Sequence, residues 1–117
     1  MTSPKTDRVR LLHMLDASQK ALQFIQNRSR QDLDQDEMLS LALVRLIEIL
    51  GEAAKNVSQQ TRDQAPSIPW RQIAGTRDRL SHAYFEVNLD IIWDIVSTDL
   101  PHLVPQLEKL LQDQTIR

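Results

Sequence analysis

The sequence contains no cysteine, which excludes a disulfide framework, a thiolate metal site and a thiol nucleophile. It has only two glycines, and this scarcity argues against an all-β fold rich in tight turns and against a glycine-rich phosphate loop. The longest apolar stretch, LSLALVRLIEIL, is interrupted by Arg45 and Glu48, so it is not a membrane span. No charged-then-apolar leader opens the chain, and we therefore expect a cytoplasmic protein with no membrane partner.

The rest of the composition is typical of one folded domain, which we expect to span residues 1–117. Hydrophobic residues make up 41% and charged residues 26% of the chain, so disorder is not expected. The net charge of −2 argues against a broad basic surface that coats nucleic acid. It leaves room for a small basic patch, because Arg71, Arg77 and Arg79 lie close in sequence to His82.

Hydrophobic periodicity predicts helices along the whole chain. The first helix is expected to be capped by Thr6 or Asp7 and to run to about Arg28. The polar stretch 27–36 is expected to be a loop. Its acidic cluster lacks the pattern of a calcium-binding loop and favours instead the dipole of the next helix. That second helix is predicted from about Asp36 to Gln59.

The second helix has a wide apolar arc, which predicts a central place in a bundle or an additional subunit contact. Gly51 lies on this helix and would allow a neighbouring helix to approach closely. Its narrow polar strip carries Arg45, Glu48, Glu52 and Lys55 at spacings of three and four, which predicts a surface ion-pair ladder. A functional role for Glu52 is the alternative.

A third helix is predicted from Trp70 to Tyr84, with Gly75 required by a close contact. Asn88 is expected to cap a fourth helix, which Pro101 would end or kink. A last helical segment follows, and Pro105 would kink it unless it falls in the first turn. The predicted fold class is thus all-α, an antiparallel bundle of four to five helices.

The third helix carries a charge that looks misplaced on a helical wheel. On this wheel, one apolar face consists of Trp70, Ile73, Ala74, Leu80 and Tyr84. Arg77 falls in the middle of that face, where a guanidinium is costly unless it is paired or lies at an opening. His82 follows, but the two side chains would be about 140° apart on a straight helix. Either the helix ends near Ser81 and the chain turns, or a second copy of the protein completes the site.

These residue types suit proton transfer beside a phosphate. Histidine is the side chain best suited to proton transfer near neutral pH, and Asp78, four residues before His82, can orient its imidazole. The structural alternative pairs Arg77 with Glu48 or Glu52 and leaves His82 as a helix C-terminal residue favoured by the dipole.

The segment RDRLSHAY, Arg77 to Tyr84, resembles the R-x-x-x-x-H-x-Y motif of HepT-like toxins of the HEPN superfamily of ribonucleases. The resemblance extends to GEAAK at Gly51–Lys55, IPW at Ile68–Trp70, IAG at Ile73–Gly75 and the tail VNLDIIWDIV. It covers most of the chain from about Leu39 to Leu111.

The resemblance implies an all-α homodimer in which the two motifs face each other, so that each site takes residues from both chains. It implies a metal-independent endoribonuclease with no cofactor, in which RNA's 2′-hydroxyl attacks the adjacent phosphate. His82 would serve as base and acid, and Arg77 would hold the phosphate. Asp78 and Ser81 would support them. Arg71 and Arg79 are the remaining candidates for RNA binding.

The family's usual partner is a minimal nucleotidyltransferase antitoxin, as in type VII-like toxin–antitoxin pairs, which transfers AMP to the motif tyrosine, here Tyr84. Such an anionic group would fill the site and neutralise Arg77. The alternative for Tyr84 is a core aromatic with a satisfied hydroxyl. Two alternatives for the whole protein are a non-catalytic helical dimer that is scaffold or substrate of the nucleotidyltransferase, and a regulator that binds nucleotides through Arg77 and Arg79.

Overall fold

The protein is an all-α bundle in the computed structural model, which describes residues 4–80 and 87–113 except for the side chains of Pro4, Lys5 and Arg77. The helices are α1 (Pro4–Phe24), α2 (Arg30–Gln35), α3 (Glu37–Lys55), α4 (Gln59–Asp63), α5 (Trp70–Ala74), α6 (Thr76–Leu80), α7 (Leu89–Asp94), the π-helical η1 (Ile95–Asp99) and α8 (Leu100–Asp113). No strand occurs in these ranges, so the predicted fold class is confirmed.

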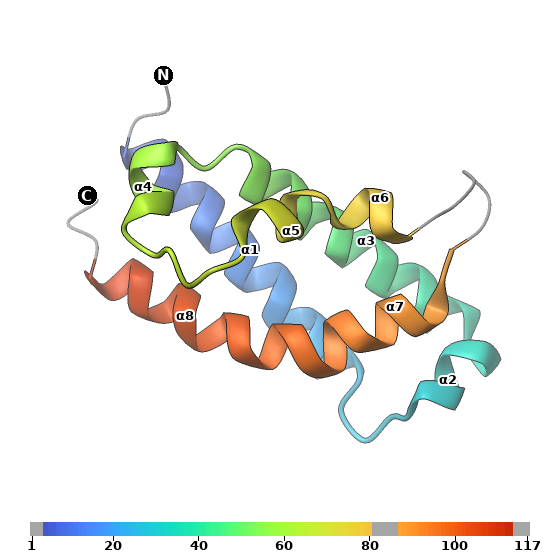
Figure 1. Cartoon of the computed structure of the whole chain (residues 1–117). Helices are drawn as coiled ribbons and strands as arrows, with labels where there is room; N and C mark the ends of the chain where they lie inside the picture. Colours follow the sequence, from blue (N-terminus) through green and yellow to red (C-terminus); the bar gives the residue numbers. More distant parts are fainter. Residues whose placement is uncertain (1–3, 81–86, 114–117) are drawn as a thin grey trace.

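Three long helical units carry the core: α1 runs in one direction, and both α3 and the α7–η1–α8 unit run in the opposite direction (Figure 1). Helix α1 packs between α3 and α8, while α7, η1 and α8 follow one another as a nearly continuous rod. The short helices α5 and α6 lie along α3 (Figure 1). Fully buried aliphatic side chains from all three long units meet at the centre: Leu11, Met14, Leu43, Ile47, Leu50, Ile92, Leu100 and Leu107. Within the described ranges, no helix combines the length and the apolar character that crossing a bilayer requires.

The start of α1 is fixed by a buried carboxylate. The helix begins at Pro4, so Asp7 lies inside its first turn and the predicted cap at Thr6 or Asp7 is wrong. Asp7 is 1% exposed and accepts hydrogen bonds from the Ser58 backbone N–H at 3.0 Å and from the Ser58 and Thr61 hydroxyls at 2.5 Å. A buried carboxylate is tolerated when such donors surround it, and this cluster joins α1 to the start of α4.

A side-chain cap sets the start of α3, and the start of the next helix sets its end. Asp36, one of the acidic residues expected to favour the dipole of this helix, caps it by accepting from the Leu39 N–H at 3.1 Å. The helix ends at Lys55 rather than Gln59, because Ser58 begins α4 by capping it. Likewise α1 ends at Phe24 rather than Arg28, and the predicted loop 27–36 contains the short helix α2.

The C-terminal rod, α7–η1–α8, accommodates both of its prolines, Pro101 and Pro105. Asn88 caps α7 by accepting from the Ile91 N–H at 3.1 Å, as predicted. Pro101 has no N–H and its ring opposes the carbonyl four residues back, yet the rod neither ends nor restarts there. Instead the chain forms the π-helical turn η1, in which the Leu100 N–H donates to the Ile95 carbonyl five residues back. Helix α8 then continues through Pro105 to Asp113.

Candidate active site around helix α6

The predicted third helix is interrupted, and this prediction of one helix from Trp70 to Tyr84 is wrong. Helix α5 ends at the C-cap Gly75, whose N–H donates to the Arg71 carbonyl at 3.0 Å. Helix α6 starts at the next residue, where the buried Thr76 hydroxyl donates to the Ile73 carbonyl at 2.7 Å. A wheel drawn through both helices therefore does not apply, and the apolar stripe assigned around Arg77 loses its basis.

Close packing against α3 fixes the position of α6. A Cβ atom on Gly51 would lie 2.9 Å from the Thr76 Oγ1 atom and 3.0 Å from the Ile73 carbonyl oxygen, closer than real contacts allow. Gly51 thus permits the close approach that the sequence predicts. At Gly75, a Cβ atom would meet the Arg71 carbonyl at 3.3 Å and the Gln72 carbonyl at 3.9 Å, both on α5 itself, so this glycine serves the end of α5 rather than contact with another helix.

The central motif residues fall largely outside the described part of the chain. Arg77 contributes its backbone to α6, while its side chain and residues Ser81, His82 and Tyr84 are not described. Their roles, including the orientation of His82 by Asp78, remain predictions. What the structure does place is the frame around the undescribed residues: α6, which carries the first four residues of the motif, and Asn88 after the motif, whose N–H donates to the Leu80 carbonyl at 2.7 Å.

Asp78 faces the polar strip of α3. It is exposed, and together with Ala74 it borders a hollow of about 540 Å³ whose other lining residues are Arg45, Glu48, Gly51, Glu52 and Lys55. Within the described residues, the only ion pair of this strip joins Arg45 and Glu48 at 3.7 Å. The predicted ladder is therefore mostly absent, and Glu52 and Lys55 face the hollow without an ionic partner among those residues.

The two candidate RNA-binding arginines lie on other hollows. Arg79 lines a cavity between α5–α6 and η1–α8. Arg71 lines a shallow hollow beside α4, where the Arg62 guanidinium lies 5.9 Å from the centre of the Trp70 ring. Arg71, Asp78 and Arg79 are all exposed, but the structure does not gather them around one hollow.

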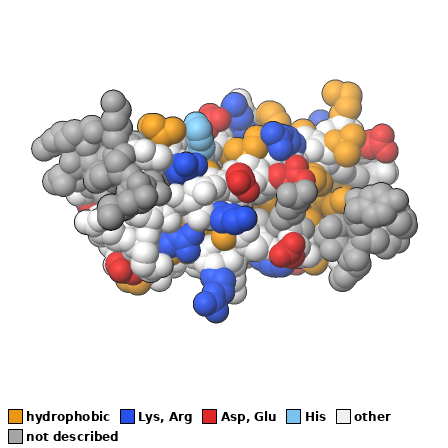
Figure 2. All heavy atoms as spheres, turned by 90° about the horizontal axis from the view of Figure 1, so that it is seen from above, with side chains coloured by type: hydrophobic (Ala, Val, Ile, Leu, Met, Phe, Trp, Pro, Cys, Tyr) orange, Lys and Arg blue, Asp and Glu red, His pale blue; other side chains and the backbone are white. Residues whose placement is uncertain are grey.

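The charges around the site are mixed in sign. Figure 2 shows the face that carries α3 to α6, where Lys and Arg side chains alternate with Asp and Glu instead of forming a broad basic field. This agrees with the net charge of −2 and points to local contacts rather than a coating of nucleic acid.

The remaining candidates for function are a metal site, the acidic cluster before α3 and His13. Among the described residues, no group of three or more His, Asp and Glu side chains is arranged to hold a metal ion. The acidic cluster before α3 acts on helix ends, since Asp32 accepts from the Ser29 N–H at 2.6 Å and Asp36 caps α3. His13 is exposed on α1, as expected for a surface histidine.

Known proteins resemble the chain over nearly its full length. The ribonuclease HepT-like family profile matches residues 14–110. "Putative RNase TTE0752" of Caldanaerobacter subterraneus subsp. tengcongensis is 38% identical over 110 residues, which cover 94% of this chain and 98% of that protein. "Probable ribonuclease HepT" of Thermococcus cleftensis is 43% identical over 75 residues, covering 64% of this chain and 68% of that protein. No solved structure matches with comparable significance. The chain therefore belongs to the ribonuclease HepT-like family, as its motifs indicate.

Proposed function

We propose that this ribonuclease family member is the toxin of a toxin–antitoxin pair, which cleaves RNA without a metal ion at a site shared between two copies of the chain. The observation that carries the proposal is the intact motif Arg77-x-x-x-x-His82-x-Tyr84 in a chain of this family. A scaffold that only binds a partner enzyme has no need of this arginine and histidine pair.

The chemistry requires three things from the side chains: a base, an acid and stabilisation of charge on the phosphate. His82 of one chain would take the proton of the attacking 2′-hydroxyl, and the second copy's equivalent histidine would protonate the leaving 5′-oxygen. Arg77 would hold the phosphate through paired guanidinium hydrogen bonds. Asp78 would orient the imidazole of His82, with Ser81 beside it.

An exposed apolar surface on α3 supports the dimer. Met38 is 82% exposed and Leu41 is 62% exposed, and both lie at the start of a helix that is otherwise central to the core. Large aliphatic side chains at such exposure favour burial against a partner. A two-fold contact along α3 would also set Arg45 of one copy near acidic residues of the same strip on the other, and it would bring the hollow beside Asp78 to the interface.

Neutralisation would act on the tyrosine of the motif. A minimal nucleotidyltransferase antitoxin would transfer AMP from ATP to the Tyr84 hydroxyl and release pyrophosphate. The added phosphate would compete for Arg77, and the added nucleoside would occupy the space that RNA needs. The same reaction requires no change in the fold, so a modified chain would keep its helix content.

The test measures intact mass and RNA cleavage on the protein alone and after incubation with the nucleotidyltransferase encoded beside it and ATP. We expect a gain of whole AMP units on Tyr84 together with loss of cleavage. Tyr84→Phe should still cleave and should gain no mass. If Tyr84→Phe is still fully suppressed, the modification part of the proposal is wrong. Absence of cleavage in both wild-type samples would instead favour a scaffold.

A further inference from the structure

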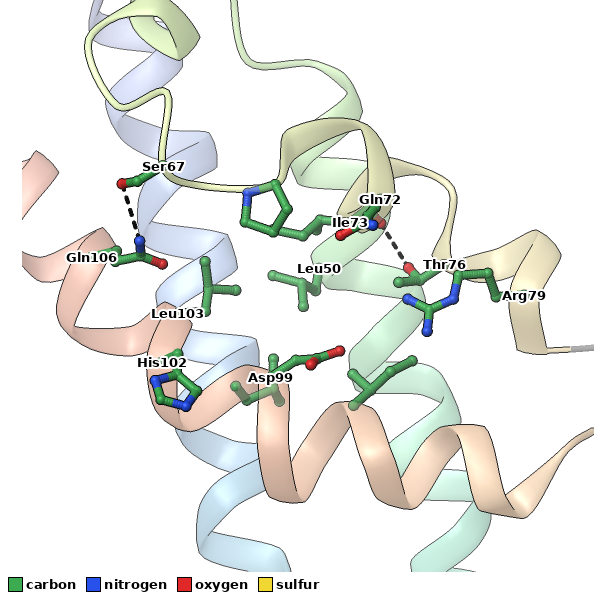
Figure 3. A pocket seen from close by; sticks show the side chains of 13 residues that line it. Leu50, Ser67, Gln72, Ile73, Thr76, Arg79, Asp99, His102, Leu103 and Gln106 are labelled. Atoms are coloured by element: carbon green, nitrogen blue, oxygen red, sulfur yellow. Dashed lines mark hydrogen bonds between the residues drawn. The ribbon is translucent and has the colours of Figure 1, made fainter.

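A second concave site lies on the side of α6 opposite the hollow that Asp78 borders. Its volume is about 280 Å³, and it separates α5 and α6 from η1 and α8 (Figure 3). The floor is apolar and buried, built from Leu50, Ile73, Ile95, Leu100 and Leu103. This size is close to the lower end of small-ligand sites, so it suits one small organic group with a flat or compact apolar body.

Charged groups of opposite sign enter the cavity from opposite walls. Arg79 comes from α6 and Asp99 from the end of η1, and Figure 3 shows both side chains directed toward the space between the walls. They form no ion pair with each other, and neither has a side-chain hydrogen bond or ionic partner among the described residues. By contrast, Arg30 binds Asp90 at 2.7 Å and Arg62 donates to three backbone carbonyls. Within the described part of the chain, the Arg79 guanidinium and the Asp99 carboxylate thus lie above an apolar floor without an ionic partner.

The rim adds groups that can recognise the edge of a heterocycle. Gln72, His102 and Gln106 border the opening, and the Gln106 amide donates to the Ser67 hydroxyl at 3.1 Å (Figure 3). Amide side chains present a donor and an acceptor side by side, which matches the edges of nucleobases. A guanidinium binds phosphate, and a carboxylate accepts hydrogen bonds from ribose hydroxyls.

We propose that this cavity binds one nucleotide unit, with its base on the apolar floor, its phosphate at Arg79 and its ribose hydroxyls at Asp99. The site rests on the proposed ribonuclease function, because Asp78 and Arg79 occupy neighbouring positions of α6 within the motif, directly after Arg77. An RNA strand held at the motif can therefore place an adjacent, unstacked nucleotide in the cavity, as single-stranded RNA does on other proteins. The cavity then selects the base beside the cleaved bond.

The π-helical turn supports this assignment. Ile95 and Asp99, the first and last residues of η1, both line the cavity, and Leu100 follows directly. Single π-turns within α-helices are frequent at functional sites, since the inserted residue redirects side chains that a regular helix would turn elsewhere. Here the turn brings an aliphatic side chain to the floor and a carboxylate to the rim.

A free nucleoside monophosphate has the same chemistry as a nucleotide within RNA, so the test has two arms. In the first, AMP, GMP, CMP, UMP and inorganic phosphate are titrated calorimetrically into the full-length protein and into Arg79→Gln and Asp99→Asn. We expect at least one nucleotide to bind at least tenfold more tightly than phosphate, and each variant to weaken that binding about tenfold or more. Arg28→Gln is the matched control. It removes one exposed arginine that pairs with Asp36 away from the cavity, and it should bind as the wild type does.

In the second arm, cleavage of a mixed-sequence RNA is mapped at nucleotide resolution. Wild type should prefer one base at a fixed position next to the cleaved bond, the base of the tightest-binding nucleotide, and Arg79→Gln should flatten this preference. Nucleotide binding without any base preference would overturn the RNA assignment and leave a site for free nucleotides. Absence of nucleotide binding to wild type, or binding unchanged in both variants, would overturn the cavity's role altogether. If wild type cleaves no RNA, the proposed function fails, while the calorimetric arm still decides on the cavity.

Discussion

Replacing Gly51 by alanine tests whether close packing of α6 on α3 holds the proposed active site in place. The new Cβ atom would start 2.9 Å from the Thr76 hydroxyl oxygen and 3.0 Å from the Ile73 carbonyl oxygen. Contacts below 3.4 Å are tighter than nine in ten real ones, so the α5–α6 segment must move by about half an ångström. The Ile73 contact is to backbone, so a side-chain rotation cannot relieve it.

Two opposing terms set the magnitude of this change. Overpacking a close contact costs about 1–3 kcal/mol, and exchanging glycine for alanine inside a helix returns about 1 kcal/mol. The net destabilisation is then about 1 kcal/mol, which corresponds to a fall in Tm of about 4 °C for a domain of this size. The displaced α6 should lower RNA cleavage by about tenfold, because misplacement of a site by about 1 Å can cost about a hundredfold in rate.

Thermal unfolding followed by circular dichroism, together with cleavage of a labelled RNA, measures both effects. Gly75→Ala is the control, because its new Cβ atom would come no closer than 3.3 Å, to the Arg71 carbonyl, and the residue's φ of −94° is open to alanine. It should change Tm less than Gly51→Ala does. A Tm of Gly51→Ala equal to or above that of wild type would refute the packing argument.

Three further predictions concern the buried carboxylate, the exposed apolar surface and the end of α3. Asp7→Ala leaves the Ser58 N–H and the Ser58 and Thr61 hydroxyls without their acceptor. The free energy of unfolding, measured in urea, should therefore fall by about 2–4 kcal/mol. A fall below about 0.5 kcal/mol would contradict a stabilising role for this cluster. Leu41→Asp places a charge on the proposed dimer contact, so light scattering should show a monomer with unchanged helix content; a persistent dimer at micromolar concentration would exclude this surface. Arg62→Ala removes guanidinium hydrogen bonds to the carbonyls of Ala54, Lys55 and Val57, and should cost about 1–3 kcal/mol by the same urea assay, whereas Lys20→Ala in an exposed pair should cost little.

The sequence predicts the long helices well because their signals are local. The apolar arc of α3, the acidic residues at its start and the cap at Asn88 each depend on residues within one or two turns of one another. The close approach at Gly51 is also predicted, because small residues on a helix let a neighbouring helix come near, whereas the close contact expected at Gly75 is not found. The all-α fold and the family follow from these same signals and from the motif.

The features that the sequence does not reveal depend on contacts between distant segments. Asp7 reads as a cap until Ser58 and Thr61, some fifty residues away, surround its carboxylate. The break between α5 and α6 looks like a tolerated glycine in one long helix, yet the Thr76 hydroxyl and its contact with Gly51 set a new helix there. The π-turn before Pro101 has no sequence signature beyond the proline itself. Residues of that turn line the cavity at Arg79, so the sequence does not reveal the cavity either.

Cleavage of RNA by wild type and by His82→Ala, in buffer containing a strong chelator, tests the central claim most directly. The account predicts that wild type cleaves without a metal ion and leaves a 2′,3′-cyclic phosphate, the product of attack by the 2′-hydroxyl. It predicts that His82→Ala loses cleavage by at least a hundredfold, the usual contribution of acid–base catalysis, while its helix content stays that of wild type. Normal cleavage by His82→Ala, or wild-type cleavage that the chelator abolishes, would contradict the account.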